Sequence, residues 1–143
     1  MSERLTFDEI ADNFELMDSW EDRYRYVIDL GKDMPELEEA RRTAATKVEG
    51  CASQVWLVPE VVENADGAVL RFEGDSDAMI VRGLIAVLIS LVSERSLSEI
   101  RALDMRAELA RLELDQALSA QRSNGLRAMV TRIEDIARSA DAA

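Results

Sequence analysis

The spacing of apolar residues predicts helices near the start of the chain. Thr6 and Glu9 have the spacing of a capping box, so we expect a helix to begin there. Ser19 can cap a second helix, and Gly31 is expected to end it. Residues 35–46 are charged, show no clear period and should form a loop with some helical turns. The expected core-facing residues are Ile10, Phe14 and Met17 in the first helix and Trp20, Tyr24, Val27 and Ile28 in the second.

The middle of the chain has the composition of β-strands. Residues 53–62 are rich in Val, Trp and Leu, residues 64–67 contain a turn pattern, and residues 68–73 alternate loosely. Two strands joined by one short turn predict an antiparallel hairpin. Pro59 has no N–H to donate, so it indicates an edge position or a bulge. A short third strand at 47–49 is a further possibility.

A helix that is apolar nearly all round is predicted after the hairpin. We expect Asp75 or Ser76 to cap this helix, which should end at about Val92. Because it lacks a polar face, it should be the central helix. A hairpin alone is only marginally stable, so helices must cover one of its faces. These features predict an α+β fold in which a small antiparallel β-sheet packs against several helices.

The last third of the chain is predicted to be helical with interruptions. Ser96 and Glu99 form a second capping-box pattern, residues 107–118 have broken helical character, and Ser119 can cap the final helix. The length of the chain suits one core, so we expect residues 1–143 to form a single domain. The expected apolar face of the final helix consists of Leu126, Met129, Val130, Ile133, Ile136 and Ala137.

Composition and charge limit the classes of partner. Hydrophobic residues make up 48% of the 143 residues and charged residues 32%, which is typical of a soluble globular protein. The 29 Asp and Glu outnumber the 17 Lys and Arg, so we expect no binding to nucleic acid or to an anionic membrane. No secretory signal or membrane-spanning run is evident, since the longest apolar stretch, residues 80–92, is short and contains Arg82. We therefore expect a cytoplasmic protein.

The chemistry open to the chain is limited by its single cysteine and its lack of histidine. A structural zinc site needs about four Cys or His ligands, and thiolate-held iron–sulfur clusters need a similar set. Catalytic pairs that use histidine are excluded, and no Gly-rich phosphate loop is present. One thiol cannot form an internal disulfide, which agrees with a reducing compartment. We expect no metal or cofactor, and Cys51 is the strongest chemical candidate.

Two interpretations of Cys51 are open. Free cysteines are often small buried apolar residues. Alternatively, Cys51 is a nucleophile on a loop, where Gly50 permits a sharp turn and the small residues Ala52 and Ser53 leave room for a partner. A thiolate attacks other sulfur atoms readily, and without a second cysteine the sulfur that it gains cannot pass into an internal disulfide. This property suits a sulfur carrier.

Five segments together resemble a known family. They are Trp20–Tyr24, Leu30–Lys32 with Pro35–Leu37, Val48–Leu57 (VEGCASQVWL), Gly74–Ala86 (GDSDAMIVRGLIA) and Leu118–Leu126 (LSAQRSNGL). In this order they resemble the SufE family of sulfur acceptors, whose members are partners of cysteine desulfurases. Departures from the family pattern are small: Ala52 stands where many members have Gln, and Ala120-Gln121 stands where a Pro-Ser pair is common.

The resemblance implies that Cys51 is the acceptor cysteine of a persulfide carrier. A cysteine desulfurase (SufS-like or CsdA-like) that uses pyridoxal phosphate would remove sulfur from L-cysteine and pass it to Cys51. The chain would stimulate this desulfurase and deliver the sulfur to a scaffold complex for iron–sulfur cluster assembly. It would therefore be a carrier rather than an enzyme, without a cofactor of its own. The resemblance also implies a fold similar to that of the IscU-type scaffolds.

Five residues besides Cys51 are candidates for binding the partner: Glu49, Gly50, Ser53, Asp77 and Arg122. Asp77 is either a first-turn acid favoured by the helix dipole or a group that touches the cysteine loop or the docking surface. Arg122 is either a solvated residue at a helix start or a desulfurase contact. By contrast, we expect Trp20 and Trp56 to belong to the core.

Two other functions are compatible with the sequence. A protein-binding module that activates the desulfurase allosterically would need no chemistry at Cys51. A cluster scaffold is suggested by the fold analogy alone, and a single thiolate cannot hold a cluster unaided.

Overall fold

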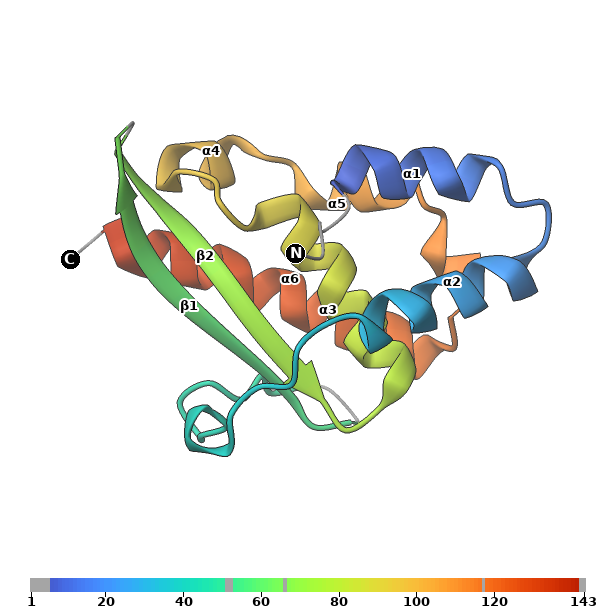
Figure 1. The fold of residues 1–143 in the computed structure, drawn as a ribbon, viewed down its shortest axis with the longest axis horizontal. Coiled ribbons are helices and arrows are strands. Elements are labelled where there is room, and N and C mark those ends of the chain that lie inside the picture. Colours follow the sequence, from blue (N-terminus) through green and yellow to red (C-terminus); the bar gives the residue numbers. More distant parts are fainter. Residues whose placement is uncertain (1–5, 51–52, 66, 117, 142–143) are drawn as a thin grey trace.

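The chain folds as a two-stranded antiparallel hairpin packed among helices (Figure 1). The computed structural model describes residues 6–50, 53–65, 67–116 and 118–141. The expected α+β class is confirmed. In chain order the elements are α1 (Phe7–Glu15), α2 (Trp20–Lys32), η1 (Glu39–Arg41), β1 (Val55–Asn64), β2 (Gly67–Ser76), α3 (Met79–Val92), α4 (Leu97–Ala102), α5 (Met105–Ala110), η2 (Leu114–Gln116) and α6 (Ala120–Asp141).

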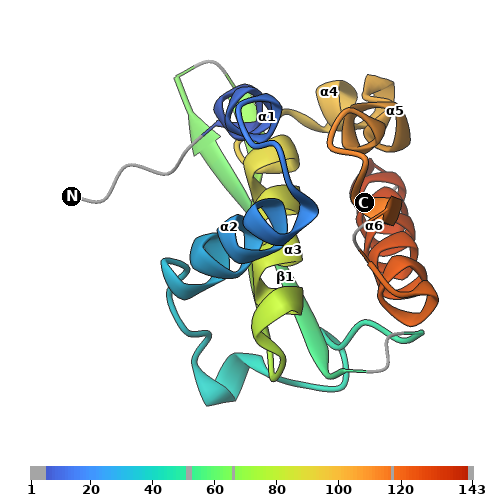
Figure 2. The same cartoon turned by 90° about the vertical axis from the view of Figure 1, so that its right-hand side faces the viewer.

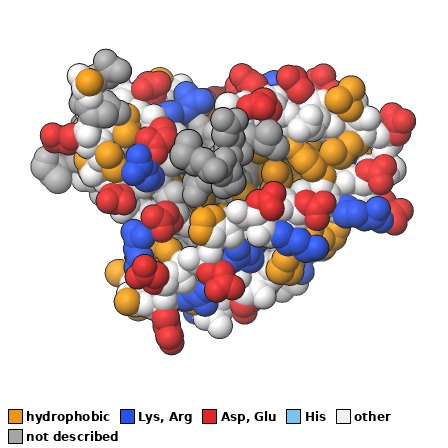
Figure 3. Space-filling model, viewed as in Figure 1, with side chains coloured by type: hydrophobic (Ala, Val, Ile, Leu, Met, Phe, Trp, Pro, Cys, Tyr) orange, Lys and Arg blue, Asp and Glu red, His pale blue; other side chains and the backbone are white. Residues whose placement is uncertain are grey.

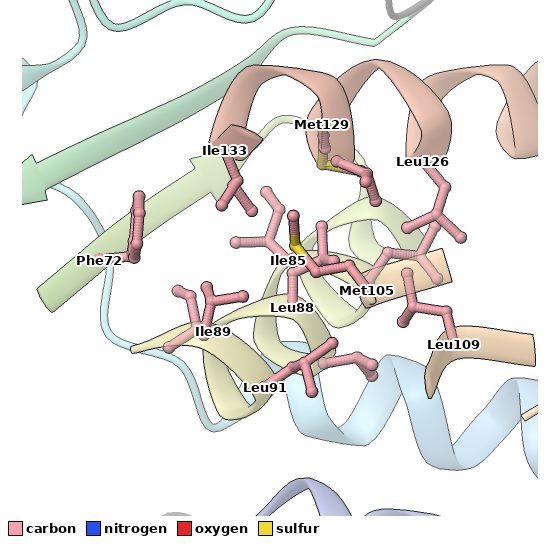
Figure 4. Packing of buried hydrophobic residues seen from close by; sticks show 14 of the residues in the cluster. Phe72, Ile85, Leu88, Ile89, Leu91, Met105, Leu109, Leu126, Met129 and Ile133 are labelled. Atoms are coloured by element: carbon pink, nitrogen blue, oxygen red, sulfur yellow. The ribbon is translucent and has the colours of Figure 1, made fainter. Parts of the chain in front are cut away.

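Helix α3 lies at the centre, as its apolar sequence predicts. Eleven of its fourteen residues are buried. Figure 2 shows α1 and α2 on one side of α3 and α4, α5 and α6 on the other. In Figure 4, Leu126, Met129 and Ile133 point from α6 toward the side chains of α3, which confirms the predicted apolar face of the final helix.

The hairpin has a continuous register from Val55 opposite Ser76 to Asn64 opposite Gly67. Val55 accepts a hydrogen bond on its outer edge from the Val48 N–H (2.8 Å). Since the direction of the backbone groups alternates along a strand, Pro59 also faces this outer edge, where its missing N–H removes no bond to β2. The edge interpretation of Pro59 is therefore correct.

The possible third strand at 47–49 is not formed as a strand. Lys47 makes one isolated antiparallel bridge to Trp56, and the Leu57 N–H donates to the Thr46 carbonyl (2.9 Å). The chain therefore runs beside the start of β1 for only a few residues before it reaches Gly50.

The capping predictions are confirmed where they depend on neighbouring residues. Thr6 with Glu9 and Ser96 with Glu99 form complete capping boxes. Ser19 caps α2, accepting from the Asp22 N–H (3.1 Å). The Ser119 hydroxyl accepts from the Arg122 N–H (3.2 Å), as expected for the cap of the final helix.

Two predictions about helix ends are wrong. The helix after the hairpin begins at Met79, with Ala78 at its N-cap and no side-chain bond there. Asp75 and Ser76 instead end β2. Gly31 does not end its helix, because α2 continues to Lys32. Contacts outside the local segment explain both differences: Asp75 is buried and pairs with Arg82 and Arg42, and Gly31 lies at a helix crossing.

The crossing of α2 and α3 requires glycine on both helices. A Cβ built on Gly31 would lie 2.6 Å from the Gly83 nitrogen, and one built on Gly83 would lie 2.0 Å from the Val27 carbonyl oxygen. Both distances are far below van der Waals contact, so any side chain would force the helices apart. This close approach sets the position of α2 against the central helix.

Replacing Gly83 with alanine should therefore destabilise the fold, although alanine favours helices. We expect a loss of about 1 to 3 kcal/mol in the free energy of unfolding, which is typical of overpacked cores. Urea denaturation measures it. The matched control is Ser90→Ala on the same helix, which should change stability by about 0.5 kcal/mol or less. A Gly83→Ala protein as stable as the wild type would contradict this account of the crossing.

Candidate functional site

The candidate site consists of the segments on either side of Cys51 and the helices that these segments contact. Cys51 and Ala52 themselves lie outside the described residues. We call residues 43–50 the N-terminal leg and residues 53–54 the C-terminal leg of the cysteine loop.

The N-terminal leg begins with a turn and then runs beside β1. In the turn, the Thr43 N–H donates to the Thr46 hydroxyl (3.0 Å), and that hydroxyl donates to the Arg41 carbonyl (2.7 Å). Val48 is buried, with 3% of its surface exposed. Gly50 has a φ of +90°, a conformation that favours glycine, and a Cβ there would lie 3.3 Å from Ala128 of α6. The leg therefore ends against α6.

The C-terminal leg is held by Asp77. The Gln54 N–H donates to the Asp77 carboxylate (3.0 Å), and the Asp77 N–H donates to the Gln54 carbonyl (3.4 Å). Asp77 lies two residues before α3 rather than in its first turn. Of its two interpretations, contact with the cysteine loop is the one that agrees with this geometry.

Ser53 and Arg122 line the same small cavity, whose volume is about 60 Å³. Ligand pockets commonly have volumes of about 300 to 1,000 Å³, so this cavity suits a few atoms rather than a cofactor. The other lining residues come from α3 and α6: Val81, Leu84, Gln121, Gly125 and Met129.

Four of the five candidate residues therefore contact or line structure next to the loop. Gly50 meets α6, Asp77 holds Gln54, and Ser53 and Arg122 share the cavity. Glu49 is exposed. Their role in binding a partner stays a prediction, and so does the role of Cys51.

A buried ion-pair network beneath this region was missed by the sequence analysis. Asp75 is 1% exposed, and its carboxylate accepts from the Leu37 N–H (2.9 Å), the Ser76 N–H (2.8 Å), Arg42 (2.6 Å) and Arg82. Arg82 also donates to the Gly31 carbonyl (3.1 Å). Arg82 is the signal for this network in the sequence, because an arginine inside an otherwise apolar helix needs a buried acceptor.

The network lowers the pKa of Asp75. Burial raises this pKa, but the N–H groups of Leu37 and Ser76 and the charge of Arg82 outweigh burial and hold it below its ordinary value. Asp75 is therefore ionised at neutral pH and contributes to stability as a carboxylate.

The two tryptophans are half-buried rather than part of the core, so that expectation is wrong. The guanidinium carbon of Arg23 lies 4.5 Å from the ring centre of Trp20, and that of Arg42 lies 5.2 Å from the ring centre of Trp56. Each tryptophan ring therefore makes a cation–π contact with an arginine guanidinium. Trp56 also lines an open groove with Leu37, Arg42 and three glutamates, Glu36, Glu38 and Glu39.

Acidic side chains are spread over the face seen in Figure 3 rather than gathered in one patch. Within the described residues, no group of three or more His, Cys, Asp or Glu side chains could hold a metal ion. In the same part of the chain, no helix is both long and apolar enough to cross a bilayer.

Comparison with known proteins identifies the family. The family model for SufE, described as an Fe-S metabolism associated domain, matches residues 8–137. The chain belongs to the SufE family. A SufE-like protein of Rhizobium etli is 52% identical over 133 residues, which cover 93% of this chain and 90% of that protein. A SufE-like protein of Rhizobium meliloti is 50% identical over 129 residues, covering 90% of this chain and 92% of that protein.

The fold of this SufE-family chain also occurs in a solved structure. A hypothetical protein from Thermus thermophilus, determined in solution, superposes with a TM-score of 0.74 at 15% identity and 96% coverage of both chains. At this identity the likeness shows the fold alone. Membership of the SufE family indicates a role in Fe–S metabolism.

Substitution of Asp75 by asparagine should destabilise the protein in a pH-dependent way. Removing one member of a buried ion pair costs about 3 to 5 kcal/mol. The folded-state pKa lies below the ordinary value of about 3.9, so the wild-type advantage is full at neutral pH and is lost as pH falls through the folded pKa. Urea denaturation at neutral pH and below pH 4 measures this difference.

The control for Asp75 is the exposed carboxylate of Asp29, which lies 4.0 Å from Lys32 on α2. Asp29→Asn should change stability by about 0.5 kcal/mol or less at either pH. An Asp75→Asn protein with wild-type stability at neutral pH would show that the network does not stabilise the fold.

Asp77 offers a second test, at the C-terminal leg. Asp77→Ala removes the acceptor of the Gln54 N–H, whereas Asp77→Asn keeps an acceptor oxygen at nearly the same place. We expect hydrogen exchange at the Gln54 amide to be faster in the alanine variant and close to wild type in the asparagine variant. Equal exchange in the two variants would mean that this bond does not hold the leg.

Proposed function

We propose that this SufE-family chain is a sulfur acceptor and carrier. Cys51 takes persulfide sulfur from a cysteine desulfurase that uses pyridoxal phosphate, and the chain stimulates that enzyme. It then delivers the sulfur to a scaffold complex for iron–sulfur cluster assembly. The observation that carries the proposal is the position of the only cysteine, between two anchored legs, in a member of a family associated with Fe–S metabolism.

The proposed transfer is an exchange at sulfur. The Cys51 thiolate attacks the outer sulfur of the donor persulfide and forms a new S–S bond. The S–S bond of the donor breaks, and its cysteine leaves as a thiolate with the electron pair. The transferred sulfur keeps its proton or loses it to water. No net oxidation or reduction occurs, so the step needs no cofactor on this chain.

The surroundings of the two legs support such a role. The 60 Å³ cavity next to Ser53 suits a few atoms, which is the size of the proposed cargo. Asp77 and Arg122 lie at the starts of neighbouring helices, where a docking partner could reach them together with the loop. We propose these two residues, with Glu49, Gly50 and Ser53, as the partner-binding surface.

Allosteric activation without sulfur transfer is the second candidate. Arg42 and Trp56 beside the open groove favour it, since none of the residues that line this groove belongs to either leg of the cysteine loop. The same experiment distinguishes the two functions, because only a carrier depends on the thiol.

The test is to mix the chain with a cysteine desulfurase and L-cysteine and to record its intact mass without reductant. A carrier should gain about 32 Da, one sulfur atom, and Cys51→Ser should gain nothing. Cys51→Ser should also fail to stimulate the desulfurase. Full stimulation by this variant would favour the allosteric module, and a wild-type protein that never gains sulfur would refute the carrier role.

A further inference from the structure

Arg132 of α6 reaches across to the N-terminal leg of the cysteine loop. Its guanidinium donates to the carbonyl of Ala45 and, at 3.4 Å, to the carbonyl of Lys47. These acceptors lie 85 or more positions away in the sequence. The contact therefore joins the C-terminal helix to the segment that leads directly into Cys51.

The pairing of the leg with β1 leaves the Lys47 carbonyl available to Arg132. The Thr46 carbonyl, which precedes it in sequence, accepts from the Leu57 N–H of β1 (2.9 Å). At the bridge between Lys47 and Trp56 the chain is extended, and there successive carbonyls point in opposite directions. The Lys47 carbonyl accordingly faces away from β1 and accepts from Arg132, while the Ala45 carbonyl accepts from Arg132 at the turn that precedes this bridge. The guanidinium supplies the donors that a further strand would otherwise provide, and its charge strengthens both bonds.

A second contact lies one helical turn away on the same flank of α6. Ala128 precedes Arg132 by four residues, so both side chains project from the same side of the helix. Ala128 meets the leg at Gly50, where a Cβ would lie 3.3 Å away. The leg is thus held along α6 from Ala45 to Gly50, the residue before Cys51.

We propose that Arg132 is a positioning residue for sulfur transfer. It holds the N-terminal leg against α6, and so it sets where the chain enters the cysteine loop. Arg132 touches only the chain's own carbonyls in this role, and it neither reacts with sulfur nor binds the partner. This inference rests on the proposed function of Cys51 as a sulfur acceptor.

The test compares Arg132→Ala with wild type in sulfur transfer from a cysteine desulfurase. Small misplacements of a reacting group slow reactions strongly, so we expect the transfer rate at saturating carrier to fall about tenfold. The carrier concentration that gives half the maximal rate should stay unchanged, because the guanidinium contacts this chain and not the partner. Hydrogen exchange in residues 45–50 should become faster, while exchange in α3 stays at the wild-type level.

Two further variants make the test specific. Arg132→Lys keeps the charge and a donor but lacks the two-pronged guanidinium, so it should recover part of the rate. Arg127→Ala is the matched control on the same helix, because Arg127 is exposed and donates to its neighbour Asn124 (2.6 Å). It should transfer sulfur at the wild-type rate.

Each contrary result has a distinct meaning. A wild-type rate in Arg132→Ala would overturn the inference and leave the carrier function intact. A change only in the half-saturating carrier concentration would also overturn it, by making Arg132 a partner contact. A wild-type protein that accepts no sulfur would refute the carrier function itself, whatever the exchange at residues 45–50 shows.

Discussion

The carboxylate of Asp75 is the interaction on which the arrangement of the other elements depends. An isolated buried charge costs several kcal/mol, so Asp75 is tolerable only with its full set of donors in place. Those donors come from Leu37, Ser76, Arg42 and Arg82, and Arg82 in turn binds the carbonyls of Gly31 and Met34. The end of β2, the start of α3, the end of α2 and the following loop are thereby fixed relative to one another.

This constraint extends to the candidate site through two residues of chain. Asp75 is held in the interior, and Asp77 just beyond it accepts from the Gln54 N–H of the C-terminal leg. The position of that leg thus depends on where β2 ends. The glycine crossing of α2 and α3 also stabilises this arrangement, because it keeps the Gly31 carbonyl within hydrogen-bond distance of Arg82. The position of the candidate site therefore depends on the buried Asp75 network and on the close packing of α2 against α3.

Elements specified by neighbouring residues could be predicted from the sequence, and those specified by distant contacts could not. Capping boxes involve residues three positions apart, and the hairpin needs only a turn pattern between two strands, so both were predicted correctly. Gly31 and Asp75 resemble local terminators and caps, but they also contact residues far away in the sequence: Gly31 meets Gly83, and Asp75 binds Leu37 and Arg42. The residues beside Cys51 could be named in advance. Arg132 could not, because nothing near it in the sequence marks its contact with the leg.

The two legs of the cysteine loop are anchored unequally, and this difference bears on how a partner could gain access. The N-terminal leg combines buried Val48, bonds to β1 and the contacts with α6. The C-terminal leg depends on the two hydrogen bonds between Gln54 and Asp77, both of which are exposed residues. A typical hydrogen bond contributes about 1 kcal/mol net, and Gln54 and Asp77 share two. Separating them costs less than detaching the N-terminal leg, which loses the burial of Val48 together with the bonds to β1 and Arg132. Local opening should therefore begin at the C-terminal leg and stop at buried Val55, while Arg132 keeps the other leg in place.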